Sequence, residues 1–159
     1  MKVFVPREVR DGEKRVALVP HIISKLVRAG LEVAIQSGAG VASGAADTSY
    51  TDAGARIVAD GSVDAELRSA DVILSVQPLS VERFRALKSG AITISFLAPS
   101  LFSDAIDAAA QSGVTAISLE LVPRISRAQS MDALTSQALC AGYKAALVGA
   151  ELSPRFFPL

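Results

Sequence analysis

The sequence predicts an α/β fold in which a Rossmann-like parallel sheet with flanking helices is followed by a long C-terminal helix. Short β-rich runs alternate with helix-like segments along most of the chain. The β-rich runs are almost continuously apolar, which is typical of parallel strands buried on both faces. The 159 residues are enough for one domain with a substantial core, and we assign that domain to residues 1–123.

The predicted strands and helices follow one another in order. Strands are expected in six apolar runs: residues 3–5, 32–35, 56–59, 71–76, 90–96 and 114–119. Helices are expected at residues 19–29, 81–88 and 103–112, the first of them because its apolar residues recur at helical spacing. Gly30 and Gly113 lie where a left-handed residue ends a helix, and Ser103 is a suitable N-cap. The stretch 38–51 is rich in Gly, Ala and Ser and is expected to be a loop.

The longest predicted helix covers residues 133–152. Small residues recur in it every four positions, at Ala138, Gly142, Ala146 and Ala150. Such a stripe favours a buried core helix, and it also fits an interdomain helix whose partner lies outside this chain. The helix is expected to end at Ser153, because Pro154 disfavours an α conformation in the residue before it.

The composition excludes several classes of protein. Lys+Arg and Asp+Glu are both 16 and aromatic residues make up 5%, so no nucleic-acid-binding surface is expected. The longest uncharged run, residues 89–103, contains Pro99 and is too short to cross a bilayer. Cys140 is the one cysteine, which we interpret as a buried, inert thiol in a cytoplasmic protein. No spacing of His, Cys and Asp predicts a metal site.

Three local patterns have both a functional and a structural interpretation. The glycines at 38, 40 and 44 are spaced one residue too widely for a dinucleotide-binding loop, and the residues after them do not open an amphipathic helix, so we expect a turn. His21 has no nucleophile at a recognisable spacing and is interpreted as a surface residue at the start of a helix. Arg15 is either an ordinary surface arginine or a guanidinium that holds a carboxylate ligand.

A dense polar run covers residues 123–132, between the last predicted strand and the long helix. Ser126 and Gln129 have the spacing of a capping box, which is the structural interpretation of this run. A capping box leaves the arginines of the run unexplained. Asp132 and Ser136 are four residues apart and share one helix face. With Arg124 as a donor and Asp132 as an acceptor, the run also suits a neutral carboxamide such as that of nicotinamide.

The chain resembles the N-terminal region of the alpha subunit of proton-translocating NAD(P) transhydrogenase. The most specific match is the run from Pro123 to Asp132. Further matches lie at residues 5–8, 15–20, 38–41, 141–144 and 155–158. The N-terminal matches are shared with the related alanine dehydrogenases, and the resemblance extends over the whole chain.

The resemblance implies a function and a set of site residues. In that family this component binds NAD(H), a separate component binds NADP(H), and a membrane component couples hydride transfer to proton movement. By resemblance, Arg124 and Asp132 orient the nicotinamide and Gln129 bridges toward the NADP(H) side. Arg127, Thr135 and Ser136 complete the expected cofactor-binding set. A homodimer at the inner face of the membrane is also implied.

Two further interpretations stay open. Alanine dehydrogenases have a lysine and a histidine where this chain has Gln77 and Ala98, so the chain is at most a remnant of such an enzyme. The chain also ends before the Gly-rich loop of the family's NAD-binding domain, so residues 124–159 are expected to lead toward that domain and the isolated chain is expected to be inactive. A non-catalytic assembly module that docks through the long helix is the alternative from a different class.

Overall fold

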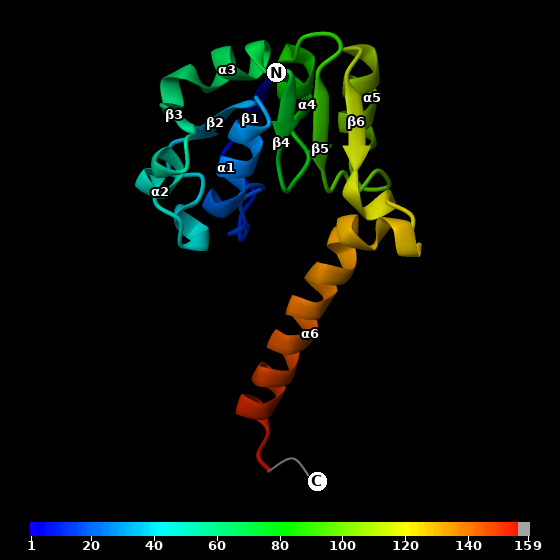
Figure 1. The fold of residues 1–159 in the computed structure, drawn as a ribbon. Coiled ribbons are helices and arrows are strands. Elements are labelled where there is room, and N and C mark those ends of the chain that lie inside the picture. Colours follow the sequence, from blue (N-terminus) through cyan, green and yellow to red (C-terminus); the bar gives the residue numbers. More distant parts are fainter. Residues whose placement is uncertain (156–159) are drawn as a thin grey trace. The chain divides into compact units, whose positions relative to one another are not determined.

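The computed structural model describes residues 1–155 and divides the chain into two compact units, Met1–Ser118 and Leu119–Leu159. The first unit is a parallel sheet covered by helices, and the second contains the polar run and the long helix. Figure 1 shows the elements of both units in sequence colours. The resemblance at residues 156–158 lies outside the described residues.

The sheet of the first unit has six parallel strands in the order β3-β2-β1-β4-β5-β6. Their bounds are β1 Lys2–Val5, β2 Glu32–Gln36, β3 Arg56–Val58, β4 Val72–Leu74, β5 Ile92–Ser95 and β6 Thr115–Ser118. Val3 of β1 is paired with Val33 on one side and Val72 on the other. The strand order therefore reverses between β1 and β4, as in doubly wound dinucleotide-binding folds. This confirms the Rossmann-like sheet predicted from the sequence.

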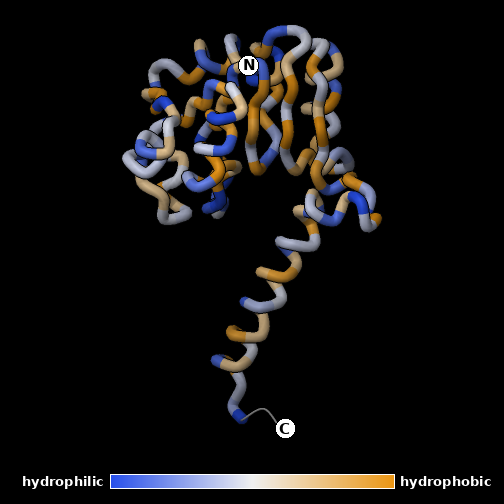
Figure 2. The backbone as a smooth tube through the Cα atoms, viewed as in Figure 1, coloured by the Kyte–Doolittle hydropathy of each residue, from blue (hydrophilic) through white to orange (hydrophobic). Residues whose placement is uncertain are grey.

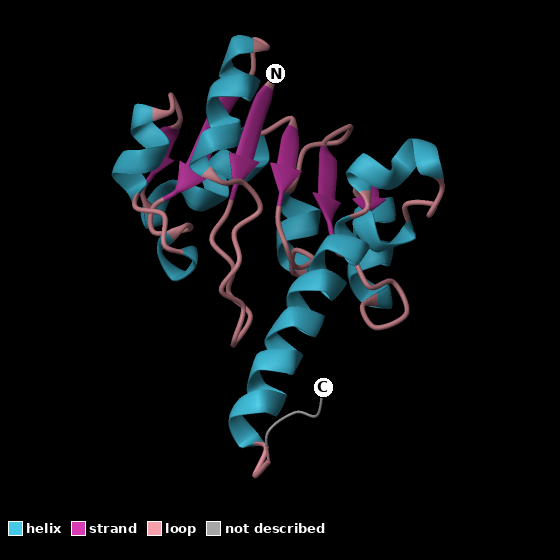
Figure 3. Cartoon of the chain, turned by 60° about the horizontal axis from the view of Figure 1, so that its bottom comes forward, coloured by secondary structure: helices cyan, strands magenta, loops and turns pink. Residues whose placement is uncertain are grey.

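Helices cover both faces of this sheet, as Figure 3 shows. Their bounds are α1 Pro20–Arg28, α2 Asp47–Asp52, α3 Val63–Ser69, α4 Val81–Ala86 and α5 Ser103–Gln111. Short 3-10 turns are present at η1 Val41–Ser43 and η2 Asp60–Ser62. The helices α1 and α2 pack on one face of the sheet, and α3, α4 and α5 pack on the other. The connections between the parallel strands cross over these two faces.

Successive side chains of each strand point to opposite faces of the sheet, so the core has two layers. The apolar strands are visible in Figure 2. Val3 and Val5 point to the α1 side, where they meet Ile23 and the fully buried Tyr50. Phe4 points to the opposite side and belongs to the larger layer, which contains the apolar side chains of α3, α4 and α5. The near-continuous apolar strands of the sequence thus reflect a sheet buried on both faces.

The structure corrects several of the predicted elements. Helices α2 and α3 have no counterpart among the predicted helices, and α2, except for its last residue Asp52, lies inside the stretch expected to be a loop. Ser103 is the first helical residue of α5, and Phe102 occupies the N-cap position without a side-chain cap. Gly30 and Gly113 do have positive φ, as predicted, at 83° and 65°.

The second unit contains η3 Leu119–Leu121, η4 Ser126–Met131 and the 20-residue helix α6 Ala133–Leu152. The helix ends at Ser153, as predicted. The favoured prediction of a buried core helix is wrong for this structure, because no described residue of α6 is buried. Cys140 is exposed, so the prediction of a buried thiol is wrong as well. Small residues permit a close approach of two backbones, but they do not specify a partner within the same chain.

Candidate functional site

The polar run folds into a loop that ends in the 3-10 turn η4 and leads directly into α6. Ala128 is the one buried residue of η4, and its backbone N–H donates to the carbonyl oxygen of Ile125 at 2.9 Å. Its small apolar side chain faces inward while the polar residues beside it stay accessible. The alternation of Ala with Arg, Gln and Ser therefore fixes which side chains this loop presents to solvent.

A pocket of about 380 Å³ lies in this unit. Its lining residues are Arg124, Ile125, Ser126, Gln129, Asp132, Thr135 and Ser136. The pocket brings together five of the six side chains predicted to contact the cofactor. Arg127 is the exception, because it is exposed and does not line the pocket.

Asp132 links the loop to the helix. It is the N-cap of α6: its Oδ1 accepts the backbone N–H of Thr135 at 2.9 Å, and its Oδ2 accepts the Thr135 hydroxyl at 2.6 Å. The hydrogen bond from the Thr135 side chain, followed by that from its backbone, lowers the pKa of Asp132 below its ordinary value of 3.8. The carboxylate is therefore ionised at neutral pH and held by Thr135 at the wall of the pocket.

The capping-box interpretation of Ser126 and Gln129 is wrong. Ser126 is the first residue of η4, Ile125 occupies the N-cap position, and no side chain caps that turn. The capping residue is instead Asp132, which caps α6 rather than η4. Ser136 adds a hydrogen bond from its hydroxyl to the carbonyl oxygen of Asp132 at 3.2 Å.

Arg15 lies in the first unit and is held by a neighbouring carboxylate. Its Nη2 lies 2.6 Å from Glu13 Oε2, and its guanidinium carbon lies 5.7 Å from the centre of the Phe96 ring. Glu13 is not among the residues expected from the sequence to have a role, although a carboxylate two residues before an arginine is a detectable signal. Ala98, where alanine dehydrogenases have a histidine, has a φ of 42°, a left-handed conformation that is unfavourable for a residue with a side chain.

The remaining patterns have structural roles. Gly38 has a φ of 73° in a turn, and Gly40 has no space for a side chain because an added Cβ would lie 2.6 Å from the Tyr50 ring. These glycines thus form a turn, as predicted. His21 is exposed at the start of α1. Across residues 1–155 no cluster of His, Cys, Asp and Glu has the arrangement of a metal site.

Comparison with known proteins identifies the family. Residues 4–141 match the family model described as alanine dehydrogenase/PNT, N-terminal domain. The chain belongs to this family. It is 40% identical over 164 residues to an NAD(P) transhydrogenase subunit alpha polypeptide of Rhodospirillum rubrum, an alignment that covers all of this chain and 42% of the relative. The alanine dehydrogenase of Bacillus subtilis is 32% identical over 151 residues, covering 95% of this chain and 38% of the enzyme.

Two solved structures are similar to this chain in fold and sequence. The transhydrogenase from Sinorhizobium meliloti superposes with a TM-score of 0.91 at 39% identity, over 100% of this chain and 47% of that chain. An L-alanine dehydrogenase superposes with a TM-score of 0.70 at 29% identity, over 77% of this chain and 33% of that chain. The chain spans less than half the length of these relatives. Among the described helices, none combines the length and the apolar character needed to cross a bilayer.

Proposed function

We propose that this chain forms a segment of the NAD(H)-side component of a proton-translocating NAD(P) transhydrogenase, in which hydride passes between NADH and NADP⁺. The observation that carries the proposal is the pocket of about 380 Å³, where five predicted cofactor contacts meet in one place. Relatives named as transhydrogenase alpha subunits support the same assignment. Residues 1–123 would serve as the Rossmann-like domain, and residues 124–159 would connect it to an NAD-binding domain.

The donors and acceptors of the pocket fit a nicotinamide carboxamide. That group needs an acceptor for its NH2 and a donor for its oxygen. Asp132 supplies the acceptor, because each carboxylate oxygen has a second lone pair beside the one used by Thr135. Arg124 lines the same pocket and supplies the donor. NAD(H), when bound, supplies the hydride, and these residues orient the ring that carries it.

Gln129 is suited to a bridging role. Its amide carries both a donor and an acceptor, and its side chain is exposed while still lining the pocket. We assign it to the contact between the NAD(H) side and NADP(H) on a partner component. Ser136 supplies a further hydroxyl at the pocket wall. Arg127 lies outside the pocket, and its proposed contact with the cofactor is from the rim.

The test replaces Gln129 by Asn in the complete enzyme assembled with its partner components. Shortening the side chain by one methylene moves the amide while keeping its chemistry, and a misplacement of about 1 Å can cost on the order of 100-fold in rate. We expect hydride transfer to slow by about 10- to 100-fold with nearly unchanged affinity for NADH. Gln111→Asn, on the exposed side of α5, is the matched control. Equal losses of rate and NADH affinity would indicate structural damage and contradict the assignment.

We also propose that the assembled protein is a homodimer that associates with a membrane component at the cytoplasmic face. An exposed row of large apolar side chains on α6 motivates the dimer. Leu139, Tyr143 and Leu147 lie four residues apart and are 74%, 70% and 50% exposed. The same row of apolar side chains favours the second candidate function, a non-catalytic assembly module. Light scattering of the chain tests whether it dimerises at all, since both candidates predict a dimer. The Gln129→Asn variant then separates them, because only a catalytic component should lose hydride transfer.

A remnant of an alanine dehydrogenase is the weakest of the three candidates. Arg15 is already paired with Glu13, and Gln77 donates its amide to the same Glu13 at 2.7 Å. The charge of Arg15 is thus already paired with a carboxylate of this chain, and Gln77 is a neutral amide that cannot replace a substrate-binding lysine. Added pyruvate should leave the melting temperature of the chain unchanged, and a clear rise would restore this candidate.

A further inference from the structure

A second pocket, of about 460 Å³, lies at the carboxyl ends of β1 and β4 in the unit Met1–Ser118. The strand order reverses between these two strands, and ligands of open α/β sheets bind in the crevice at this position. Its volume lies within the usual range for small-molecule sites. The chain continues from β1 as Pro6-Arg7-Glu8 without a Gly-rich loop, so backbone recognition of a pyrophosphate is not expected here.

The charged lining of this pocket is mainly cationic. Three arginines line it: Arg7, Arg10 and Arg83. Glu8 is the one carboxylate in the lining. Its two oxygens accept the backbone N–H groups of Val76 at 2.6 Å and Gln77 at 3.2 Å, so its charge is directed to the end of β4. Burial raises the pKa of Glu8 from its ordinary value, while these two backbone hydrogen bonds lower it.

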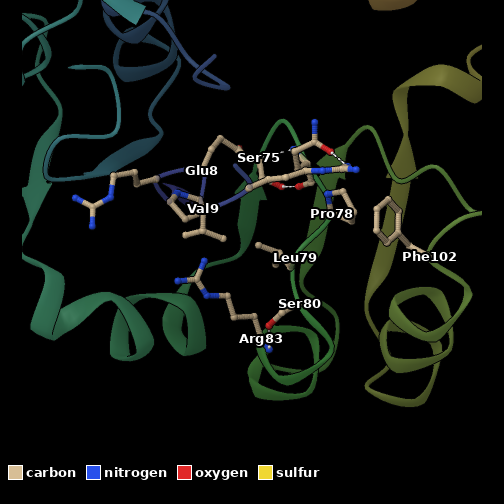
Figure 4. Close-up of a pocket in the computed structure, with 12 residues that line it drawn as sticks. Glu8, Val9, Ser75, Pro78, Leu79, Ser80, Arg83 and Phe102 are labelled. Atoms are coloured by element: carbon tan, nitrogen blue, oxygen red, sulfur yellow. Dashed lines mark hydrogen bonds between the residues drawn. The ribbon is translucent and has the colours of Figure 1, made fainter. Parts of the chain in front are cut away.

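Two of these guanidiniums have no carboxylate partner within residues 1–155. Arg10 donates to the neutral amide oxygen of Gln77 at 3.0 Å, and its guanidinium carbon lies 5.4 Å from the centre of the Phe102 ring. Arg83 extends from α4 toward Val9, as Figure 4 shows. Arg7 differs, because its Nη2 lies 3.5 Å from Asp60 Oδ2.

The rest of the pocket is apolar. Val9, Leu79 and Phe102 line it, and the Phe102 ring lies on the opposite side from Arg83 in Figure 4. These three residues also border an adjoining hollow of about 360 Å³, which extends to Leu101. A ligand in this place would therefore meet two guanidiniums and a continuous apolar wall.

We propose that this switch-point pocket binds a small organic oxyanion, a carboxylate or a phosphate monoester, that carries a ring-sized apolar body. Arg83 holds the oxyanion, because a guanidinium fork matches the oxygens of a carboxylate or a phosphate. Arg10 lies near the Phe102 ring, on the side of the pocket where the body binds. Leu79 and Phe102 contact the body. The lining contains Gln77, where alanine dehydrogenases have a lysine, but neither Arg15 nor Ala98, and it shares no residue with the pocket assigned to nicotinamide.

The test is calorimetric titration of the 159-residue chain with benzoate, phenyl phosphate and inorganic phosphate. We expect the two aromatic anions to bind at least about tenfold more tightly than inorganic phosphate, because only they reach the apolar wall. The tighter of the two identifies the headgroup. Arg83→Gln should weaken binding about tenfold or more, since it removes a charge-assisted hydrogen bond.

Arg85→Gln is the matched control, because Arg85 lies exposed on the same helix and outside the pocket. It should change the affinity less than about twofold. Circular dichroism of each variant establishes that the fold is retained. The proposal is overturned if no aromatic anion binds at about 10 mM, a concentration that already corresponds to negligible affinity. It is equally overturned if Arg85→Gln weakens binding as much as Arg83→Gln does. Since the pocket assigned to nicotinamide shares none of these residues, neither result bears on the transhydrogenase assignment.

Discussion

Replacing Glu13 by Gln should destabilise the first unit at neutral pH, because Glu13 fastens the segment between β1 and α1 to the end of β4. Oε1 accepts the backbone N–H of Arg15 at 3.0 Å and its Nε–H at 2.7 Å. Oε2 accepts Arg15 Nη2 at 2.6 Å and Gln77 Nε2 at 2.7 Å. The Glu13 side chain is 6% exposed, so these four bonds are its main contacts. An amide at this position keeps one oxygen acceptor and places an NH2 group against the donors.

The expected magnitude follows from the pKa of Glu13. The Arg15 hydrogen bond is the largest cause that lowers this pKa from 4.5 to about 2. Each pKa unit corresponds to about 1.4 kcal/mol, so the shift sets an upper limit of about 3 kcal/mol. The Arg15 side chain is 42% exposed, and water screens its charge. We therefore expect a loss of about 1–2 kcal/mol in the free energy of unfolding.

The assay is urea unfolding of wild type and Glu13→Gln between about pH 7 and about pH 3, with the difference taken at each pH. A carboxyl whose pKa is lower in the folded state stabilises the fold above its unfolded pKa, and this contribution is lost as the pH falls toward the folded pKa. The difference between the two proteins should therefore be largest at neutral pH and should shrink as the pH falls below 4.5 toward about 2. Because the other carboxylates titrate in both proteins, their contributions to the free energy of unfolding cancel when the two proteins are compared at the same pH.

Asp11→Asn is the control, because Asp11 lies in the same segment and is exposed. It should change the stability by less than about 0.5 kcal/mol at every pH. The reasoning is refuted if Glu13→Gln costs no more than this control at neutral pH. It is also refuted if the cost of Glu13→Gln is the same at low and neutral pH.

Three further substitutions test the fold by thermal or urea unfolding. Ala98→Gly should stabilise the chain by about 0.5–1 kcal/mol, because glycine tolerates the observed φ of 42°; a loss of stability would contradict this. Gly40→Ala should cost about 1–3 kcal/mol, since its Cβ would lie 2.6 Å from the Tyr50 ring and 2.7 Å from the Ala45 carbonyl oxygen; a neutral effect would show that this region adjusts freely. Tyr50→Phe should cost about 1 kcal/mol by removing the hydrogen bond to the Leu18 carbonyl oxygen at 2.9 Å, and a gain in stability would exclude that role.

The strands could be predicted from the sequence because each is a short apolar run that needs no distant information. The two missed helices lack such a signal. In α2 only Tyr50 is buried, so the helix depends on where that one side chain packs. In α3 the inward positions include Glu66, a charged residue, which hides the apolar spacing. Glu66 is accommodated because its Oε1 lies 3.2 Å from Lys2 Nζ and 2.8 Å from Arg56 Nη2.

The grouping of residues in the pocket of the second unit could be predicted because they are local in sequence. Residues 124–136 come from one loop and one helical turn, so their spacing alone places them together. The identity of the capping residue could not be predicted, since Ser126 and Asp132 both suit that role. The switch-point pocket had no local signal. It combines residues near 7–10, 75–83 and 102, which meet only because β1 and β4 are neighbours in the sheet.

In the proposed cofactor site, the two hydrogen bonds of Asp132 give an exposed loop an acceptor with a defined orientation. A carboxylate that only caps α6 would need one oxygen, yet Asp132 uses both, one for the backbone and one for the hydroxyl of Thr135. The second bond adds little to capping, but it fixes the rotation of the carboxylate and so the direction of its remaining lone pairs. The first turn of α6 thus serves as the support that holds the acceptor in place. Any ligand that draws on Asp132 is thereby coupled to the start of the long helix.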